Sequence, residues 1–419
     1  MAQPLPRLRT NLDFMPSPLR DRPGLLIRDP FRYSDLTLII PPVLVQCLEC
    51  FDGERTELDI KEILVRVTGE LETGDVAAHL IETLSNGGFL ENEAFERIKE
   101  ERHRDFAARP QREAIHAGNS YPSEILPLRS TMDRYMGGPQ NQAQSDGLLG
   151  IAAPHVSPEG GWQSYRAAYG MMAPQYKDRT FVVLGTSHYG EPERFGLTRK
   201  AFLTPLGESR VDVPLVDWLE QKAAPAIRME DYCHAVEHSI EFQVLFLQHL
   251  YGPDIRILPI LCGPYARSIY LGGKPEQDES VSRFLDALGE MAAREAGRLF
   301  WVLGIDMAHM GRRYGDSFTA RADEGPMIAI TARDRSRIDC LATGDAEGFW
   351  SLVQEKRDDL KWCGSSVLYT FLKALPQARG NLLRYEQWNI DEQSVVSFGG
   401  IAFADAAPAY IKPSSADGP

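Results

Sequence analysis

From Leu148 to Ala404, strand-like apolar runs alternate with helical patterns, and this alternation limits the possible folds more than any other feature of the chain. The strand-like runs are Leu148–Ala153, Arg179–Gly185, Ile255–Leu261, Leu299–Gly304 and Ser394–Ala404. The helical patterns between them are Gly161–Met172, Ser239–Leu250, Ser280–Arg294, Asp323–Thr343 and Ser365–Leu375. Strands that alternate with helices in this way are typical of a mainly parallel sheet with helices on its faces. The sequence therefore predicts an α/β fold.

Histidines stand where several of these strands are expected to end. His155, His188 and His309 each follow an apolar run within a few residues, and His238 lies near the start of a predicted helix. The loops after parallel strands converge on one crevice, which is where ligands usually bind. Imidazole is also the commonest protein ligand for transition metals. The pattern predicts a metal pocket, although any one such histidine is more often structural.

The surroundings of His238 leave two roles open. Glu237, Ser239 and Glu241 suit the start of a helix, where an imidazole tends to be neutral and can serve as a base or a ligand. A capping role is an equally good interpretation. His234 makes an HxxxH pair with His238, but without the glutamate of the zinc proteases this pair is weak evidence for a metal.

Asp306 and Cys363 complete the set of candidates. Asp306 follows the strand-like run that ends at Gly304 and is placed to orient a histidine from outside the metal's own ligands. Cys363 precedes the helix expected at Ser365, and a thiol near a helix N-terminus has a lowered pKa that makes it a nucleophile or a soft metal ligand. Burial as a small apolar side chain is the alternative. Cys262 is a weaker candidate of the same kind.

The N-terminal part of the chain follows a different pattern. Between Pro23 and Asn92 the sequence predicts a short strand, three short helices beginning near Pro42, Thr56 and Thr73, and a final strand at Phe89–Asn92, which together describe a winged helix. The charged segment that follows is expected to be a connecting helix. The predicted division is a winged-helix domain over 1–92, a linker over 93–115 and a metal-site domain over 116–412.

Composition excludes several classes of partner. The net charge is −14, and residues 1–115 hold 15 Lys and Arg against 21 Asp and Glu, a net −6 that opposes binding to a nucleic-acid backbone. No run approaches the roughly 18 apolar residues of a membrane span, and no secretory signal is visible. Six cysteines in 419 residues do not indicate a disulfide framework. We expect a cytoplasmic protein that binds neither nucleic acid nor membrane.

The N-terminal segment resembles the PqqD-like family of peptide-recognition domains. The matching stretches are Cys50–Thr56, Asp75–Leu80 and Leu84–Leu90. The resemblance covers about 70 residues and implies that this domain binds a peptide along the edge of its sheet. A DNA-binding regulator is the rival interpretation of a winged helix, and the acidic charge disfavours it.

The rest of the chain resembles the Memo family, in particular the B component of AmmeMemoRadiSam systems. Six motifs occur in the family's order: Ala117–Pro122 (AGNSYP), Ile151–His155 (IAAPH), Leu184–His188 (LGTSH), Glu237–Glu241 (EHSIE), Asp306–His309 (DMAH) and Cys363–Gly364 (CG). The resemblance spans about 290 residues. The chain departs from the family at Tyr189, which replaces the second histidine of an SHH pair, and at Ser365–Ser366, which replace an Arg-His pair.

This second resemblance implies a fold like that of the class III extradiol dioxygenases, which are non-haem iron enzymes with an α/β sandwich. It implies a metal held by His155, His188 and Cys363, with iron favoured and copper as the alternative. His238 would be the acid/base residue, and Glu237, Asp306 and His309 would line or support the pocket. The implied role is redox or oxygen-related chemistry beside a radical SAM protein and an AMMECR-type protein. The alternative is a non-catalytic module that binds a peptide or partner and keeps a vestigial pocket.

Overall fold

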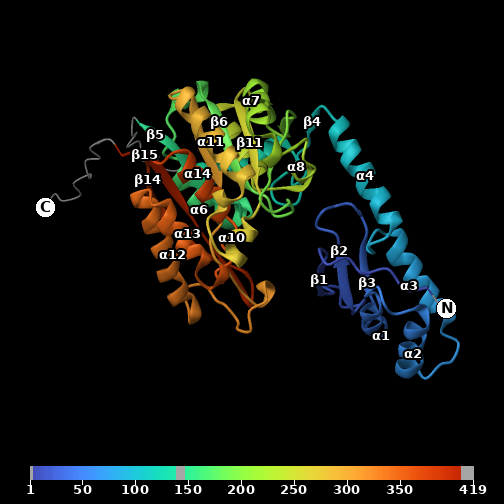
Figure 1. The fold of residues 1–419 in the computed structure, drawn as a ribbon. Coiled ribbons are helices and arrows are strands. Elements are labelled where there is room, and N and C mark those ends of the chain that lie inside the picture. The colour runs from blue at the N-terminus through green and yellow to red at the C-terminus, as the bar shows by residue number, and fades with distance from the viewer. Residues whose placement is uncertain (1–2, 138–146, 407–419) are drawn as a thin grey trace. The chain divides into compact units, whose positions relative to one another are not determined.

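The computed structural model describes residues 3–137 and 147–406, so residues 1–2, 138–146 and 407–412 of the predicted domains lie outside the described part. The chain divides into two compact units, Met1–Ala108 and Arg109–Pro419 (Figure 1). Each unit has a sheet and an apolar core of its own.

The first unit combines a small antiparallel sheet with four helices. Its strands pair in the order β1-β2-β3, and Ile27 of β2 and Ile40 of β3 are buried in the core beneath them. The elements are β1 (Asp13–Pro16), β2 (Leu25–Arg28), β3 (Thr37–Ile40), α1 (Pro42–Val45), α2 (Glu57–Thr68), α3 (Gly74–Asn86) and α4 (Glu93–Ala108). Helix α2 begins as the sequence predicts, because the Asp59 carboxylate accepts the backbone N–H of Thr56 at 2.7 Å and so caps its first turn.

Four features of this part of the chain differ from the sequence-based expectation. The strand predicted at Phe89–Asn92 is not formed, and Leu90 makes only an isolated bridge with Leu8. The helix expected from Pro42 onward shortens to α1 and continues as a 3₁₀ turn over Gln46–Cys50. Strands β1 and β3 were not predicted, because four-residue strands with a proline or an exposed face carry little signal. The segment predicted as a linker contains α4, which belongs to the first unit, and then β4 of the second.

The second unit is built on a large, mainly parallel sheet. Its main path runs β13-β15-β5-β12-β6-β11-β9-β8-β4, and the central strands β5, β12, β6 and β11 are parallel to their neighbours in this run. The strands are β4 (Gln111–Arg112), β5 (Leu148–Ala153), β6 (Thr180–Thr186), β7 (Phe195–Leu197), β8 (Ala201–Thr204), β9 (Gly207–Val211), β10 (Ile227–Met229), β11 (Arg256–Cys262), β12 (Leu299–Gly304), β13 (His309–Gly311), β14 (Ala378–Asp391) and β15 (Ser394–Asp405). The unit is therefore a mixed α/β fold, as the sequence predicts.

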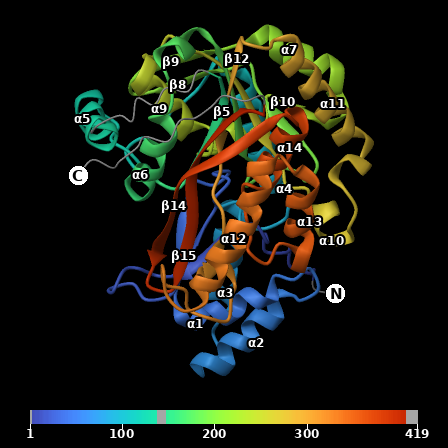
Figure 2. The ribbon, with the colours of Figure 1, turned by 90° about the vertical axis from the view of Figure 1, so that its left-hand side faces the viewer.

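Helices cover both faces of this sheet (Figure 2). Alternate side chains of β6 enter two separate cores: Val182 and Leu184 pack with α7, α11 and α14, whereas Phe181 and Val183 pack with α6 and α9. The helices are α5 (Ile125–Met136), α6 (Pro158–Tyr169), α7 (Val213–Ala223), α8 (Cys233–Val236), α9 (Glu241–Tyr251), α10 (Ala266–Leu271), α11 (Glu279–Arg294), α12 (Pro326–Thr343), α13 (Ala346–Gln354) and α14 (Ser365–Ala374). None of the helices in residues 3–137 and 147–406 has both the length and the apolar character of a membrane span.

The five predicted strands correspond to β5, β6, β11, β12 and β15, and the five predicted helices to α6, α9, α11, α12 and α14. Strand β15 runs antiparallel to β5, so the sheet changes direction beside the strand that carries His155. Strand β14, which pairs with β15 along almost its whole length, was not predicted. Its side chains are mostly polar and half-buried, so the sequence lacks the apolar run that marks the central strands.

Candidate metal centre

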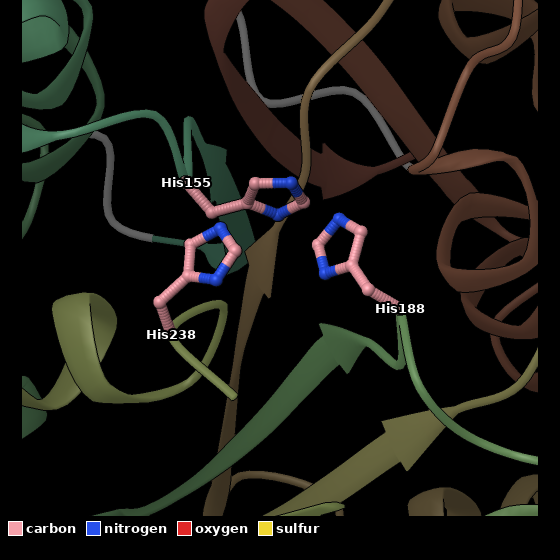
Figure 3. A group of neighbouring side chains, drawn as sticks. All are labelled: His155, His188 and His238. Carbon is pink, nitrogen blue, oxygen red and sulfur yellow. The ribbon is translucent and has the colours of Figure 1, made fainter. Parts of the chain in front are cut away.

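Three histidines converge at the carboxyl edge of the parallel strands. His155 follows β5, His188 follows β6, and His238 lies in the short loop between α8 and α9. Strands β5 and β6 lie on either side of β12, so their ends face the same crevice. One ligand atom of each ring lies within 4.8 Å of the others, and the rings face one another (Figure 3).

The thiol of Cys363 also lies at this cluster. Its Sγ lies 3.2 Å from Nε2 of His155 and 3.6 Å from the carbonyl oxygen of Asp306. Cys363 stands just before α14, which packs against β6, β11 and β12, so the helix fixes its position. The structure thus brings together the three predicted ligands, His155, His188 and Cys363, and the predicted acid/base residue, His238.

The outward nitrogens of two imidazoles are held by hydrogen bonds. Nδ1 of His155 lies 3.0 Å from the carbonyl oxygen of Gly304, which requires a proton on Nδ1. Nδ1 of His188 lies 3.1 Å from Oε2 and 3.2 Å from Oε1 of Glu237. Glu237 also accepts the backbone N–H of His188 at 2.7 Å. Both rings therefore turn Nε2 toward the cluster, and Nε2 is the atom through which a histidine held in this way binds a metal once that nitrogen is deprotonated.

His238 is held differently. Its Nδ1 lies 3.8 Å from Oε2 of Glu237, beyond hydrogen-bond distance, and within residues 3–137 and 147–406 its imidazole has no hydrogen-bond partner. Its ring lies 5.0 Å from that of His188, 5.2 Å from that of His155 and 5.6 Å from that of His116, measured between centroids. His238 is therefore positioned by ring packing, not by hydrogen bonds.

Burial and charge set opposite protonation states for neighbouring groups. Burial and the nearby His188 hold the pKa of His155 and of His238 well below the usual range, so both are neutral. Burial opposes protonation of His188 too, but Glu237 and Cys363 outweigh it and raise the pKa of His188. Burial alone would raise the pKa of Glu237, yet the positive charge of His188 lowers it to about 2.

Asp306 holds the backbone at His155 and Val156. Its Oδ1 accepts the backbone N–H groups of His155 at 3.0 Å and Val156 at 3.3 Å, and its Oδ2 lies 3.4 Å from Nε2 of His155. Burial raises the pKa of Asp306 to about 7 against these hydrogen bonds. Burial also raises the pKa of the Cys363 thiol, which opposes the lowering expected at a helix N-terminus.

The other two predicted histidines lie outside the cluster. Nδ1 of His309 lies 2.9 Å from the carbonyl oxygen of Met307 and 3.1 Å from that of Lys361, and burial lowers the pKa of His309 to about 4. His309 is therefore neutral. His234 points elsewhere, since its Nε2 lies 3.0 Å from the carbonyl oxygen of Gly196, so the HxxxH pair does not form a site.

A buried ion pair behind His238 was not foreseen. The guanidinium of Arg112 contacts the carboxylate of Glu241 and donates to the carbonyl oxygens of His234 at 2.7 Å and Glu237 at 2.6 Å. The same carboxylate accepts from the hydroxyl of Tyr121. Both charged side chains are fully buried. Arg112 therefore ties the backbone of α8 and of the residue after it to the Glu241 side chain at the start of α9.

The sequence indicates one member of this ion pair, Glu241, but not the other, Arg112. Glu241 is an acid at the start of the apolar helix Phe242–Tyr251, and a buried acid needs a partner. Arg112 lies in a segment rich in charges, where nothing distinguishes it from a solvated side chain. Its role becomes visible only once β4 is placed beside β8.

Fold and site together define an α/β protein with a cluster of histidines and a cysteine at its strand ends. The profile of the family described as "Memo-like protein" matches residues 112–402, and the chain therefore belongs to the Memo family.

Relatives extend this match. A MEMO1 family protein of Aquifex aeolicus is 26% identical over 383 residues, which cover 90% of this chain and 95% of the relative. The aligned part of this chain is longer than its second unit, so the alignment also includes part of the first unit. A MEMO1 family protein of Pyrococcus furiosus is 30% identical over 252 residues, covering 58% of this chain and 80% of its own. A protein of known structure from Escherichia coli K12, described as uncharacterized, is 13% identical to this chain. The match covers 54% of this chain and 86% of the Escherichia coli protein, and its TM-score is 0.32, which is too low to show a shared fold.

Proposed function

We propose that the second unit binds one redox-active metal ion through His155, His188 and Cys363 and uses it in redox or oxygen-related chemistry. Iron is the favoured ion and copper is the alternative, because two imidazoles and a thiolate suit soft, redox-active metals better than magnesium or calcium. A metal held this way would supply electron transfer or Lewis-acid activation of a substrate or of oxygen.

The observation that carries this proposal is the difference between the three imidazoles. Histidines that bind metals nearly always donate their second ring N–H to a carbonyl or a carboxylate. His155 does so to Gly304 and His188 to Glu237, whereas His238 has no such acceptor among the described residues. This supports His155 and His188 as ligands, with Cys363 as the third donor at 3.2 Å from His155.

His238 fits a different task. It is neutral, its side chain is 27% exposed, and its ring faces the two histidine ligands. A neutral imidazole at this position can take a proton from a bound molecule and return it later. Asp306 would fix the backbone of His155, Glu237 the ring of His188, and His309 would line the pocket.

The wider setting follows from the resemblances of the two units. We propose that the protein works in an AmmeMemoRadiSam system with a radical SAM protein and an AMMECR-type protein. The first unit would act as a PqqD-like winged-helix domain that binds a peptide. Its three-stranded sheet supports this role, because β1 and β3 each have one edge free for strand addition within the described sheet.

Metal analysis of purified variants tests the ligand assignment. Iron or copper content should be near one ion per chain in the wild type and should fall below a tenth of that in His155→Ala and Cys363→Ser. His249→Ala is the matched control, because His249 lies on α9 and its nearest charged partner is Asp133, at 3.9 Å. Unchanged metal content in both ligand variants would reject the assignment and favour the non-catalytic binding module.

A further inference from the structure

A cavity of about 260 Å³ opens beside the candidate metal centre. His188 and Cys363 form part of its wall, so a molecule inside it would touch the ligands of the proposed metal. Sites for drug-sized molecules occupy roughly 300–1,000 Å³. This cavity therefore suits a small molecule and excludes a folded or extended peptide.

One part of the wall presents only carbon. Tyr265, Trp350 and Trp362 line the cavity, and the polar atom of each ring already has a partner in the protein. The Tyr265 hydroxyl lies 2.6 Å from Oγ1 of Thr370, while Nε1 of Trp350 donates to Ser268 at 2.7 Å and Nε1 of Trp362 donates to Asp334 at 2.6 Å. The rings are thus free to contact an apolar body but have no hydrogen bond to offer it.

Asp358 and Lys361, which are also part of the wall, are each paired with an opposite charge. Asp358 accepts from the buried guanidinium of Arg337 at 2.8 Å, and Nζ of Lys361 lies 2.9 Å from Oδ1 of Asp316. Neither side chain presents an unpaired charge to a ligand. Selectivity must therefore come from the remaining polar groups.

Two hydroxyls of the wall, those of Ser187 and Ser365, have no hydrogen-bond partner among the described residues, and Ser365 stands at the start of α14. Ser365 lines the cavity and is 4% exposed, and its hydroxyl has no hydrogen-bond partner within residues 3–137 and 147–406. Gly364 occupies the N-cap and cannot cap the helix with a side chain, so the N–H of Ser366, which lines the cavity, has neither a helix acceptor nor a side-chain cap among the described residues. The helix end also carries a partial positive charge. An oxyanion is the ligand group that satisfies this set.

We propose that the cavity binds a small apolar carboxylic acid as its carboxylate. The carboxylate would accept from the Ser365 hydroxyl and the first turn of α14, and the apolar body would lie against Tyr265 and Trp350. This inference rests on the proposed function in one respect, which is that the bound acid is the substrate of the metal centre. A neutral compound of the same shape would lose the attraction of the helix end and bind less tightly.

Calorimetric titration of the full chain tests the proposal. The probes are phenylacetate, 3-phenylpropionate and 4-phenylbutyrate, each compared with its neutral amide, with the protein metal-free and loaded with Fe(II) under anaerobic conditions. At least one carboxylate should bind at least tenfold more tightly than its amide, and Ser365→Ala should weaken that carboxylate at least fivefold without affecting the amide. Because the Ser365 hydroxyl is unpartnered, its removal should leave the fold intact.

Ser164→Ala is the matched control, since Ser164 is a buried serine on α6 that does not line the cavity and whose hydroxyl bonds Glu386. It should bind the probes as the wild type does. Equal binding of acid and amide, or no binding of any probe below 10 mM, would overturn the proposal. Metal content is measured on the same samples. Unchanged metal content in His155→Ala, with the carboxylate still bound, would count against the proposed function and not against this cavity.

Discussion

Glu237→Gln is the substitution that tests most directly how the candidate metal centre is held. The side chain keeps its size and can still accept the backbone N–H of His188 and the proton on Nδ1, which Glu237 now accepts at 2.7 Å and 3.1–3.2 Å. The negative charge is lost, and so is the second acceptor oxygen that lies 3.1 Å from Nδ1. His188 then becomes a weaker base and a weaker metal ligand.

The structure sets the size of the effect. The pKa of Glu237 falls from 4.5 to about 2 beside His188, which corresponds to about 3 kcal/mol of preference for the charged form. That value is an upper limit, since glutamine retains the hydrogen bonds. Loss of such a supporting carboxylate typically costs about 10–100-fold in metal affinity, and a hundredfold loss corresponds to about 2.8 kcal/mol. We expect the upper part of this range because Glu237 is 2% exposed.

The assay is competition between the protein and a chelator of known affinity for Co(II), read from the thiolate-to-cobalt absorbance that Cys363 would provide. Glu230→Gln is the matched control. The Glu230 carboxylate also has a lowered pKa and accepts a backbone N–H, from Arg199 at 3.0 Å, but it lies outside the histidine cluster. Affinity in Glu237→Gln within twofold of wild type, with affinity lost in His155→Ala, would refute the role given to this carboxylate.

Three further outcomes are expected. Arg112→Met should lower the free energy of unfolding by about 3–5 kcal/mol in urea titration, because it leaves Glu241 as an uncompensated buried charge, and adding Glu241→Gln should recover part of the loss. A saturating metal at 100 times its dissociation constant should stabilise the wild type by about 2.7 kcal/mol and leave His155→Ala unchanged, as measured by thermal unfolding. Burial raises the pKa of Asp334 above 3.8 even though Trp362 donates to it, so its favourable contribution is present below pH about 3.8 and is lost as pH rises through the raised value. Asp334→Asn should therefore gain stability relative to wild type as pH rises above about 3.8, and a constant difference would contradict this.

The central strands could be predicted because of where they lie. Strands β6 and β12 are buried on both faces, so each appears as a continuous apolar run, and the fold class follows from their alternation with helices. Strand β14 could not be predicted in this way, since it lies at the side of β15 with half-buried polar side chains. The strands of the first unit were harder to predict. The strand expected at Phe89–Asn92 is not formed, and Leu90 makes only a single bridge to Leu8.

The site shows the same division between local and distant information. The histidines could be found because each follows a recognisable strand or begins a helix, and parallel strands bring their ends to one edge. The partners that orient them could be found only in part. Glu237 is adjacent to His238 in sequence, yet it binds His188, which lies 49 positions away. No local pattern in the sequence indicates that His188 is its partner. The carbonyl of Gly304 that holds His155 has no side-chain signature at all.

The way the rings are held also bears on which residues can change protonation during function. His155 and His188 each have one nitrogen fixed by an acceptor, so movement of either ring would break a buried hydrogen bond. His238 can turn without such a cost, because ring packing alone positions it. Arg112 meanwhile binds the backbone carbonyls of His234 and Glu237, which precede that ring, and the carboxylate of Glu241, which follows it. An imidazole without a hydrogen-bond partner can accept and release a proton without breaking a buried hydrogen bond, and this distinguishes His238 from the two histidines beside it.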